Sequence, residues 1–233
     1  MANPSNSPQR NQTTNQPGSQ SGNEKVSQVE KVAGDETVAI VLAAGFSKRF
    51  GSDKRFHPLQ LSNKETVQSK PLLQATLDSI VPQFQHIVVV HRFEDEDILA
   101  LLKHYPVNAV AAPKAPIGLG VSLATAAKYI LEKTQPPKRL MVFLGDMPNI
   151  KHATIEQLLA QSAKSPDAVV RPRYQGKSGH PVCLPATFLK ALTSLNRDEG
   201  AAALIQTSNC PVLRVDVNDS GVLFDIDTPE QSG

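Results

Sequence analysis

The chain has 233 residues, of which 40% are hydrophobic and 20% are charged. This balance is ordinary for a globular protein with a buried core, and the length allows one large domain or two small ones. The formal net charge of +2 is too small for a general nucleic-acid or membrane-surface binder, so any basic site has to be local.

The N-terminal segment, residues 1–36, is polar and is predicted to be a disordered tail. Between Ala2 and Lys25 there is no valine, isoleucine, leucine or aromatic residue, so the segment buries too little apolar surface to offset its chain entropy. We place the folded domain at residues 37–233. No stretch has the apolar core of a secretory signal or the roughly 18 apolar residues of a membrane span, and we therefore expect a cytoplasmic protein.

From Val38 onward, short apolar runs alternate with longer segments of helical periodicity. The runs predicted as strands are residues 38–44, 86–91, 107–112 and 139–146, and the helices predicted after them are residues 71–81, 94–105, 120–133 and 152–163. Four successive strand–helix pairs predict a single doubly wound α/β domain, with a mostly parallel sheet and helices on both faces. The strands are continuously apolar, as is typical of strands buried on both sides.

The C-terminal part is less regular. Apolar segments occur at residues 167–174 and 180–185, helices are predicted near residues 187–195 and 200–206, and two further apolar segments follow at residues 212–217 and 221–226. In a sheet of this kind ligands bind at the carboxyl ends of the strands. The residues that follow each strand are therefore where functional groups are expected.

The first predicted strand leads into LAAGFSKRFGSDK, residues 42–54. Small residues at Ala43, Ala44 and Gly45 allow the backbone to approach a ligand closely, and successive N–H groups in such a turn can bind an anion. Arg49 and Lys54 can supply positive charge to phosphate oxygens. The segment matches neither the P-loop nor the dinucleotide-binding pattern. The residues alone leave two interpretations open, a phosphate site and a solvated basic loop.

Acidic residues follow two later apolar runs. Asp146 stands in GDMP after the fourth strand, where it suits a Mg²⁺ ligand or the N-cap of the next helix. Asp225 and Asp227 stand two apart in FDIDTPE, where a cation between them or a solvated edge would each explain the spacing. A glycine turn with basic residues and two acidic sites at strand ends favours Mg²⁺-assisted phosphoryl or nucleotidyl transfer.

These segments resemble the signatures of the nucleotidyltransferases related to molybdenum cofactor biosynthesis. LAAGFSKRFGSDK is similar to the family's LAAGxSxRxGxxK, PIGLGVSL to its GxGxSL, FLGDMP to its GDxP, RYQGKSGHPVCLP to its YxGxxGHP and FDIDTPE to its DIDTPE. The segments span Leu42 to Glu230 in the family's order. The resemblance therefore covers essentially the whole predicted domain.

The resemblance implies transfer of a nucleoside monophosphate from an NTP to a phosphorylated acceptor, with release of pyrophosphate. It implies roles for the following residues: Leu42, Ala43, Ala44, Gly45, Ser47, Gly118 and Ser122 in nucleotide binding, Arg49 and Lys54 in neutralising the triphosphate, Asp146 with Asp227 or Asp225 in holding Mg²⁺, and Gly179 with His180 in facing the acceptor. Arg49, Lys54 and Asp146 are the expected catalytic residues. No nucleic-acid or membrane partner is expected.

Within the family, LAAG resembles the cytidylyltransferase form and LAGG the guanylyltransferase form. Ala44 therefore favours CTP as donor and the molybdenum cofactor (molybdopterin) as acceptor. This function would bring the protein into transient contact with a molybdoenzyme or its chaperone. The alternatives are the use of GTP, the same chemistry on a sugar or polyol phosphate, and a non-catalytic nucleotide- or cofactor-binding protein.

The chain departs from the family pattern in three places, one of which is Glu230-Gln231, where the family usually has Glu-Asp. The segment between Lys54 and Lys70 is longer and more polar than expected, which leaves open a phosphate-binding role for Lys70. Residues 196–202, NRDEGAA, stand where the family has GDxGAR, and the arginine after Gly-Ala is missing. A contact to the acceptor is therefore expected to differ here.

Overall fold

The computed structural model describes residues 1, 36–45, 53–63, 66–133, 135–196, 198 and 200–225. Most of the predicted tail, residues 2–35, lies outside the described part, as do Ser47, Arg49 and Asp227. Among the described residues, no helix combines the length and the apolar character that a membrane span requires.

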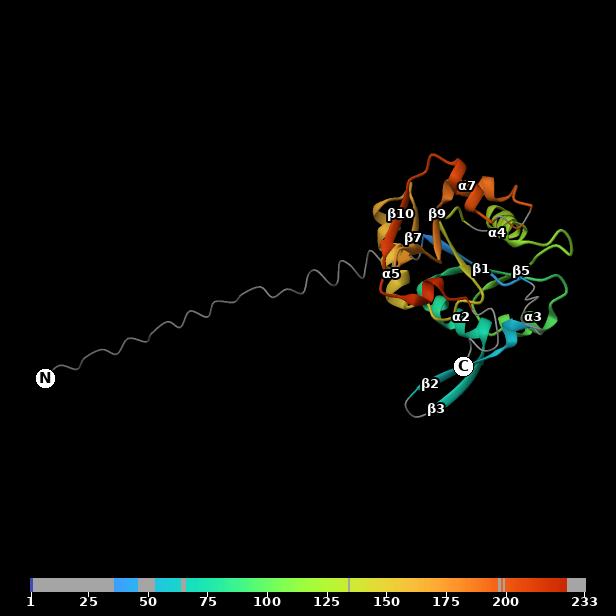
Figure 1. Ribbon diagram of the computed structural model, residues 1–233, viewed down its shortest axis with the longest axis horizontal. Coiled ribbons are helices and arrows are strands. Elements are labelled where there is room, and N and C mark those ends of the chain that lie inside the picture. The colour runs from blue at the N-terminus through green and yellow to red at the C-terminus, as the bar shows by residue number, and fades with distance from the viewer. Residues whose placement is uncertain are drawn as a thin grey trace.

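The central sheet has the order β10-β7-β9-β6-β1-β4-β5, with β8 paired to β7 (Figure 1). Its strands are β1 (Thr37–Leu42), β4 (His86–His91), β5 (Asn108–Ala111), β6 (Arg139–Leu144), β7 (Val169–Tyr174), β8 (Lys177–Ser178), β9 (Val182–Pro185) and β10 (Val212–Asp216). The pairs β1–β4, β1–β6, β4–β5 and β7–β10 are parallel, whereas β9 runs antiparallel to β6 and β7. The predicted doubly wound, mostly parallel sheet is confirmed.

Helices cover both faces of the sheet, and each face has its own apolar core. The helices α2 (Leu72–Ile80), α3 (Glu96–Leu102) and α5 (His152–Lys164) contribute to one core, and α4 (Leu119–Lys133), α6 (Leu189–Leu192) and α7 (Ala202–Thr207) contribute to the other. Short 3₁₀ turns complete the chain: η1 (Lys54–Phe56), η2 (Val81–Gln83), η3 (Ala186–Phe188) and η4 (Ser220–Leu223).

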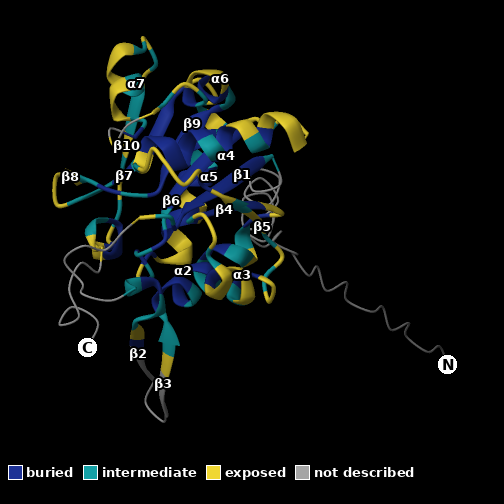
Figure 2. Cartoon of the chain, turned by 90° about the vertical axis from the view of Figure 1, so that its right-hand side faces the viewer, coloured by how far each residue is buried: buried dark blue, intermediate teal, exposed yellow. Residues whose placement is uncertain are grey.

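Strand β1 shows why the apolar run in the sequence is uninterrupted. Ala39 and Val41 pack into the core beneath α2 and α5, while Val38 and Ile40 pack into the core beneath α4. Successive side chains of a strand point to opposite faces, so a strand covered on both sides needs an apolar residue at every position. Figure 2 shows the strands at the centre of the molecule as buried throughout.

The polar segment after Lys54 forms η1 and then a hairpin that stands apart from the main sheet. Strands β2 (Pro58–Asn63) and β3 (Thr66–Pro71) pair antiparallel with each other, and Pro58 is opposite Pro71 (Figure 1). The length and polarity of this segment in the sequence therefore correspond to an added two-stranded arm.

Candidate functional site

A cleft of about 470 Å³ opens where β1 and β6 end. Because these strands are parallel, their carboxyl ends share one edge of the sheet. The lining residues come from distant parts of the sequence and are Leu42, Ala44, Gly45, Ile117, Gly118, Leu119, Ser122, Leu144, Asp146 and Asp198. The cleft thus brings together the glycine turn, the start of α4 and the GDMP acid, as the sequence predicted.

The turn that follows β1 is held through its backbone carbonyl groups. Arg55 Nη1 donates a hydrogen bond to the Ala43 carbonyl at 3.0 Å, and Arg92 Nη2 donates to the Gly45 carbonyl at 2.6 Å. A Cβ atom at Gly45 would have no neighbour within 4 Å among the described residues, whose packing therefore does not require glycine there. The turn is therefore anchored by two guanidinium groups and is open at Gly45, where a ligand can approach the backbone.

These two arginines belong to a network of alternating charges with Asp53 and Asp95. Arg55 binds Asp95 and donates from Nε to Asp53 Oδ1 at 2.8 Å, and Arg92 Nη1 donates to Asp53 Oδ2 at 2.8 Å. Burial would raise the pKa of Asp53, but its hydrogen bonds and charge interactions with Arg55 outweigh this and hold that pKa below its ordinary value. The network surrounds the turn with paired charges. Its Asp53 carboxylate stays ionised at neutral pH.

Asp146, which lines the cleft, is bonded to Lys54. Lys54 Nζ lies 2.6 Å from Asp146 Oδ2, and the two side chains are only 13% and 21% exposed. The other carboxylate oxygen, Oδ1, is buried and has no hydrogen-bond partner among the described residues. Buried carboxylate oxygens normally have a partner, so this oxygen is available to a ligand or cation.

The alternative role for Asp146, as the N-cap of the following helix, does not fit the structure. Helix α5 begins at His152, after the N-cap residue Lys151. Its first turn is capped instead by Asp219, whose Oδ2 accepts hydrogen bonds from Lys151 N at 2.9 Å and Thr154 Oγ1 at 2.6 Å. The capping acid therefore comes from a distant segment, and Asp146 remains directed to the cleft.

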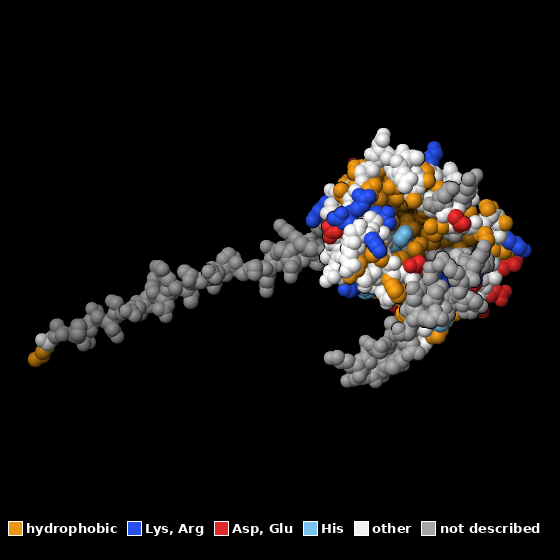
Figure 3. Space-filling model, viewed as in Figure 1, with side chains coloured by type: hydrophobic (Ala, Val, Ile, Leu, Met, Phe, Trp, Pro, Cys, Tyr) orange, Lys and Arg blue, Asp and Glu red, His pale blue; other side chains and the backbone are white. Residues whose placement is uncertain are grey.

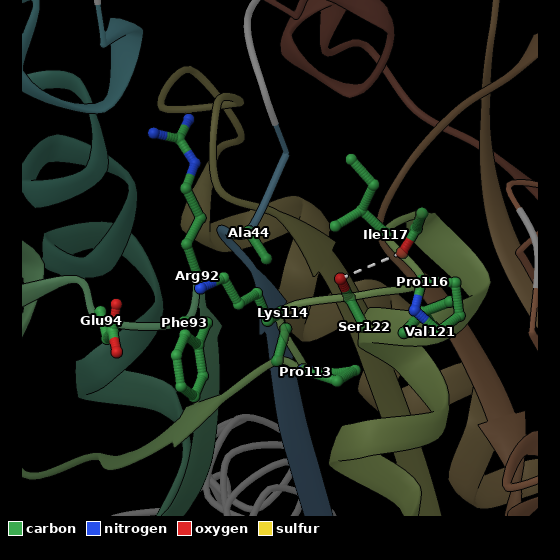
Figure 4. Close-up of a pocket in the computed structure, with 12 residues that line it drawn as sticks. Ala44, Arg92, Phe93, Glu94, Pro113, Lys114, Pro116, Ile117, Val121 and Ser122 are labelled. Carbon is green, nitrogen blue, oxygen red and sulfur yellow. Dashed lines mark hydrogen bonds between the residues drawn. The ribbon is translucent and has the colours of Figure 1, made fainter.

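A second cavity, of about 210 Å³, adjoins the cleft between the end of β4 and the start of α4 (Figure 4). Ala44 and Ser122 line both cavities, and the Ser122 hydroxyl donates to the Gly118 carbonyl at 3.2 Å. Phe93 and Lys114 lie on its wall, with the Lys114 ammonium 6.0 Å from the centre of the Phe93 ring. The mixture of apolar walls and polar groups suits a planar heterocycle.

A third cavity, of about 130 Å³, lies on the other side of the cleft and shares the side chains of Leu42, Leu119 and Leu144 with it. We call it the apolar lobe. Its further lining residues are Leu123, Val142, Arg171, His180, Val182, Leu184, Gly200, Ala201, Ala202 and Ile205. Arg171 and His180 are the only titratable side chains in this lining, within the part of the chain that the structure describes.

His180 lies two residues before the antiparallel strand β9 and is joined to Pro181 by a cis peptide bond. Burial lowers the pKa of His180, and the nearby charge of Arg171 lowers it further, against opposing effects of the Val142 backbone, Asp146 and Asp225. The imidazole is therefore neutral at pH 7, and its Nδ1 atom is buried without a partner among the described residues.

A model of the MobA-like NTP transferase domain matches residues 39–212 of the chain. The match covers both the glycine turn and the GHP segment. The chain belongs to the MobA-like NTP transferase family.

Several relatives of this NTP transferase are known. The purine catabolism protein PucB of Bacillus subtilis (strain 168) is 26% identical over 202 residues, which are 83% of this chain and 93% of PucB. A Mycobacterium sp. strain JC1 homologue of the Mycobacterium tuberculosis protein Rv0371c has a TM-score of 0.66 at 24% identity, with 84% of this chain and 92% of that chain covered.

Two further solved structures share the fold. The manganese complex of Rv0371c from Mycobacterium tuberculosis H37Rv has a TM-score of 0.58 at 22% identity and covers 78% of this chain and 88% of that one. The molybdopterin-guanine dinucleotide biosynthesis protein A of Archaeoglobus fulgidus has a TM-score of 0.58 at 20% identity. The match covers 83% of this chain and 94% of that one. The central sheet is thus one that these solved structures share.

A divalent cation fits the residues that the NTP transferase presents at Asp146. The fit rests on the unpartnered buried oxygen Oδ1 and on the carboxylate chemistry, because Mg²⁺ prefers oxygen ligands. Asp225 is exposed, and its charge acts on His180, as the charge of Asp146 does. No cluster of three or more acidic, histidine or cysteine residues occurs within the described ranges, and the predicted ligand Asp227 lies outside them.

The remaining predicted residues of the transferase lie in different places. Ala43 is buried in the core and touches the site only through its carbonyl group. Gly179 is buried as well, and a Cβ atom there would lie 2.1 Å from the Val222 carbonyl oxygen, so packing against η4 alone requires glycine. Ser47 and Arg49 lie outside the described residues, and their roles remain predictions.

Lys70 and the NRDEGAA segment, where the chain departs from the family pattern, have different positions relative to the cleft. Lys70 Nζ binds Asp78 Oδ2 at 2.8 Å, and neither residue lines the three cavities. Asp198 lines the cleft and accepts a hydrogen bond from Leu119 N, the first residue of α4, at 3.3 Å. The altered segment therefore keeps an aspartate at the cleft, whereas Ala202 stands in place of the family's arginine.

Sequence reasoning missed Asp53, Arg55, Arg92 and Asp95 in this transferase. They lie in two short segments, around Lys54 and directly after β4, where charged residues look like ordinary surface loops. The available signal was that residues after a buried strand are candidates in this fold, and Arg92 directly follows β4. That rule would have identified Arg92, but the pairing with Asp53 becomes visible only in three dimensions.

Proposed function

We propose that this NTP transferase transfers CMP from CTP to the terminal phosphate of molybdopterin and releases pyrophosphate. The observation that carries the proposal is the Lys54–Asp146 pair at 2.6 Å, whose carboxylate lines the same cleft as Ala44 and Gly45 of the anchored turn. A cation for phosphate oxygens and a carboxylate for a metal thus stand together beside a backbone that a nucleotide can approach.

The triphosphate would lie along the turn Ala43–Gly45, with Lys54 on its oxygens. Arg49 and Ser47 have the same proposed role from the adjoining segment. The nucleobase would occupy the cavity between Phe93 and Ser122, next to the Ala44 side chain (Figure 4). Each contact would neutralise or position charge, which is the main task of a protein in phosphoryl-type transfer.

In the proposed reaction, an oxygen of the acceptor phosphate forms a bond to the α-phosphorus of CTP. The bond from the α-phosphorus to the bridging oxygen of the β-phosphate breaks, and pyrophosphate leaves with that electron pair. The acceptor is already ionised near neutral pH, so no side chain has to remove a proton. The neutral His180 and the glycine-bearing segment before it would lie on the acceptor side.

Asp146, together with Asp225 and Asp227, would hold Mg²⁺ in this reaction. The ion would neutralise charge that develops on the phosphate oxygens. The manganese complex of Rv0371c supports a divalent cation in this fold. The choice of Mg²⁺ over Mn²⁺ is part of the proposal.

The proposed acceptor and the proposed nucleobase of the donor rest on two separate observations. The family model and the relative from Archaeoglobus fulgidus are connected by name with molybdopterin dinucleotides. Ala44 lines the base cavity and corresponds to the cytidylyltransferase form of the turn. GTP as donor and a sugar or polyol phosphate as acceptor are the alternative substrates. A partner molybdoenzyme or chaperone would receive the product.

Pyrophosphate release with CTP and with GTP, each with and without molybdopterin, tests this function. We expect release that requires both CTP and molybdopterin. Release with glycerol 3-phosphate or a sugar phosphate instead would favour the alternative acceptors. Tight binding of CTP without release under any of these conditions would favour a non-catalytic binding protein.

A further inference from the structure

The apolar lobe contains an arginine whose neighbours differ from those of an otherwise similar arginine. Strands β7 and β10 are parallel, and their register places Arg171 beside Arg214 and Arg173 beside Asp216. Arg173 binds Asp216 through two hydrogen bonds, of 2.6 and 2.7 Å. On the same face of the same ladder, one arginine therefore has a carboxylate beside it and the other has a second arginine.

The setting of Arg171 is unfavourable for a cation. Arg171 Nη2 donates to the Gly179 carbonyl at 3.2 Å, but Nε is buried and has no partner, and no carboxylate binds this side chain among the described residues. Burial lowers the pKa of Arg171, and the charge of Arg214 lowers it further. Like charges side by side on a sheet are destabilising, and so is a buried cation without an opposite charge. An anion at Arg171 would relieve both penalties.

The position of Arg171 separates it from the nucleotide phosphates. The strand order runs from β1, which precedes the turn, through β6, which precedes Asp146, and β9, which follows His180, to β7 with Arg171. An anion at Arg171 would therefore lie on the opposite side of Asp146 from the turn. Figure 3 shows basic side chains gathered beside a hollow whose walls are mainly hydrophobic and include a histidine.

We propose that Arg171 binds the phosphate of the acceptor, and that the apolar lobe, in which Arg171 lies with the neutral His180, selects acceptors in which this phosphate is attached to an apolar or aromatic body. This inference rests on the proposed function, because the transfer reaction proposed above defines which molecule is the acceptor. It deepens that function by predicting that the site prefers an aromatic phosphate monoester to a polyol phosphate. The described lining offers the hydroxyl groups of a polyol few hydrogen-bond partners besides the side chains of Arg171 and His180.

Two simple phosphate monoesters test the site without turnover. Phenyl phosphate has an aromatic body, and glycerol 3-phosphate has a polyol body. Binding of each is measured by NMR titration with a saturating nucleotide already bound, on the full chain and on Arg171→Met, Arg171→Lys and Arg173→Met. Arg173 is the matched control, because it lies on the same face of β7 but is paired with Asp216.

We expect phenyl phosphate to bind more tightly than glycerol 3-phosphate to the unmodified protein. Arg171→Met should weaken binding of phenyl phosphate about 10- to 100-fold, the effect of a charge-assisted hydrogen bond, while Arg171→Lys should recover part of it. Arg173→Met should bind phenyl phosphate as the unmodified protein does. Nucleotide affinity should be unchanged in all variants.

A merely structural role for Arg171, through its bond to Gly179, would give a different pattern. Arg171→Met would then lower the thermal midpoint and weaken nucleotide and phenyl phosphate alike. That result, equal affinity for the two monoesters, or unchanged binding of phenyl phosphate in Arg171→Met would overturn the inference. Binding that depends on Arg171 without any turnover of molybdopterin would instead refute the proposed function and leave the site standing.

Discussion

Lys54 Nζ lies 2.6 Å from Asp146 Oδ2, so a cation from the 3₁₀ turn before the hairpin is bonded to the carboxylate that follows β6. The pair joins two segments that are far apart in the sequence. It also keeps both charges compensated at a site where each side chain is mostly buried. A triphosphate with its metal could replace this pairing by giving Lys54 phosphate oxygens and Asp146 a cation.

The first prediction concerns Asp146. Asp146→Asn should lower kcat for pyrophosphate release at least about 100-fold, since charge stabilisation worth several kcal/mol would be lost. The control is Asp78→Asn, which alters a similar Lys–Asp pair, with Lys70, away from the cavities. Turnover of Asp146→Asn at the unmodified rate with saturating Mg²⁺ would remove the main support for the mechanism.

The second prediction concerns Arg55, whose side chain is only 6% exposed. Arg55→Met should lower the free energy of unfolding by about 3–5 kcal/mol, because Asp95 would remain as a buried charge without its partner. It should also raise KM for the nucleotide, since the Ala43 carbonyl loses its anchor. Urea denaturation measures the first effect, and Arg173→Met is the exposed control. Equal midpoints for the two variants would contradict the prediction.

The third prediction contrasts two glycines. Gly179→Ala should destabilise the fold by more than about 2 kcal/mol, because its Cβ would lie 2.1 Å from a backbone oxygen of Val222. Gly45→Ala should leave the thermal midpoint unchanged, since no atom of the part of the chain that the structure describes lies within 4 Å of its Cβ position, but should raise KM for the nucleotide. Thermal unfolding and steady-state kinetics on both variants separate packing from ligand contact. The reverse pattern would show that the turn does not contact the nucleotide.

The fourth prediction concerns pH. Burial lowers the pKa of His91, as it does that of His180, from an ordinary value of 6.5. Between the lowered folded-state pKa and 6.5 the unfolded chain binds more protons, so stability is full above 6.5 and is lost as the pH falls. The effect of Asp53, whose pKa lies below 3.8, begins only at lower pH.

Urea denaturation midpoints at about pH 7.5 and about pH 5.5 measure this loss of stability. His91 and His180 should each contribute to it. His91→Gln should reduce the difference between the two midpoints. His86→Gln, at an exposed position at the other end of β4, is the control and should not change it. A difference that is the same in His91→Gln and in the unmodified protein would rule out His91 as a contributor.

The fifth prediction concerns the choice of base. Ala44→Gly should shift the ratio of kcat/KM for CTP and GTP toward GTP by about tenfold, the lower end of what one methyl group in a pocket contributes. Ala43→Gly is the control, because it removes the same methyl group from the core next to the site. Competition between the two nucleotides measures the ratio. An equal shift in both variants would indicate a general loosening of the turn.

Much of the fold could be predicted because burial leaves a local pattern. The runs that became β1, β4 and β6 are apolar except at their ends, and each is followed by a helix of clear periodicity. The hairpin of β2 and β3 was not predicted, because its segment is polar and lacks that pattern. Propensity and periodicity do not indicate an arm that packs little against the core.

The site was predictable only in part. Asp146 and Gly45 were predicted because they directly follow strands, and they do line the cleft. The partner of Lys54, the cap provided by Asp219 and the charge network around Arg55 were not predictable, because each joins segments that lie far apart in the chain.

The sequence by itself determined the family, the parallel sheet and the edge at which function is expected, because these depend on short segments whose pattern is complete within the chain. Only the tertiary structure decided what each charge is bonded to. Arg171 and Arg173 are identical in type and two residues apart, yet one lies beside Arg214 and the other beside Asp216. That difference arises from the register of β7 against β10, and register is set when the strands pack together.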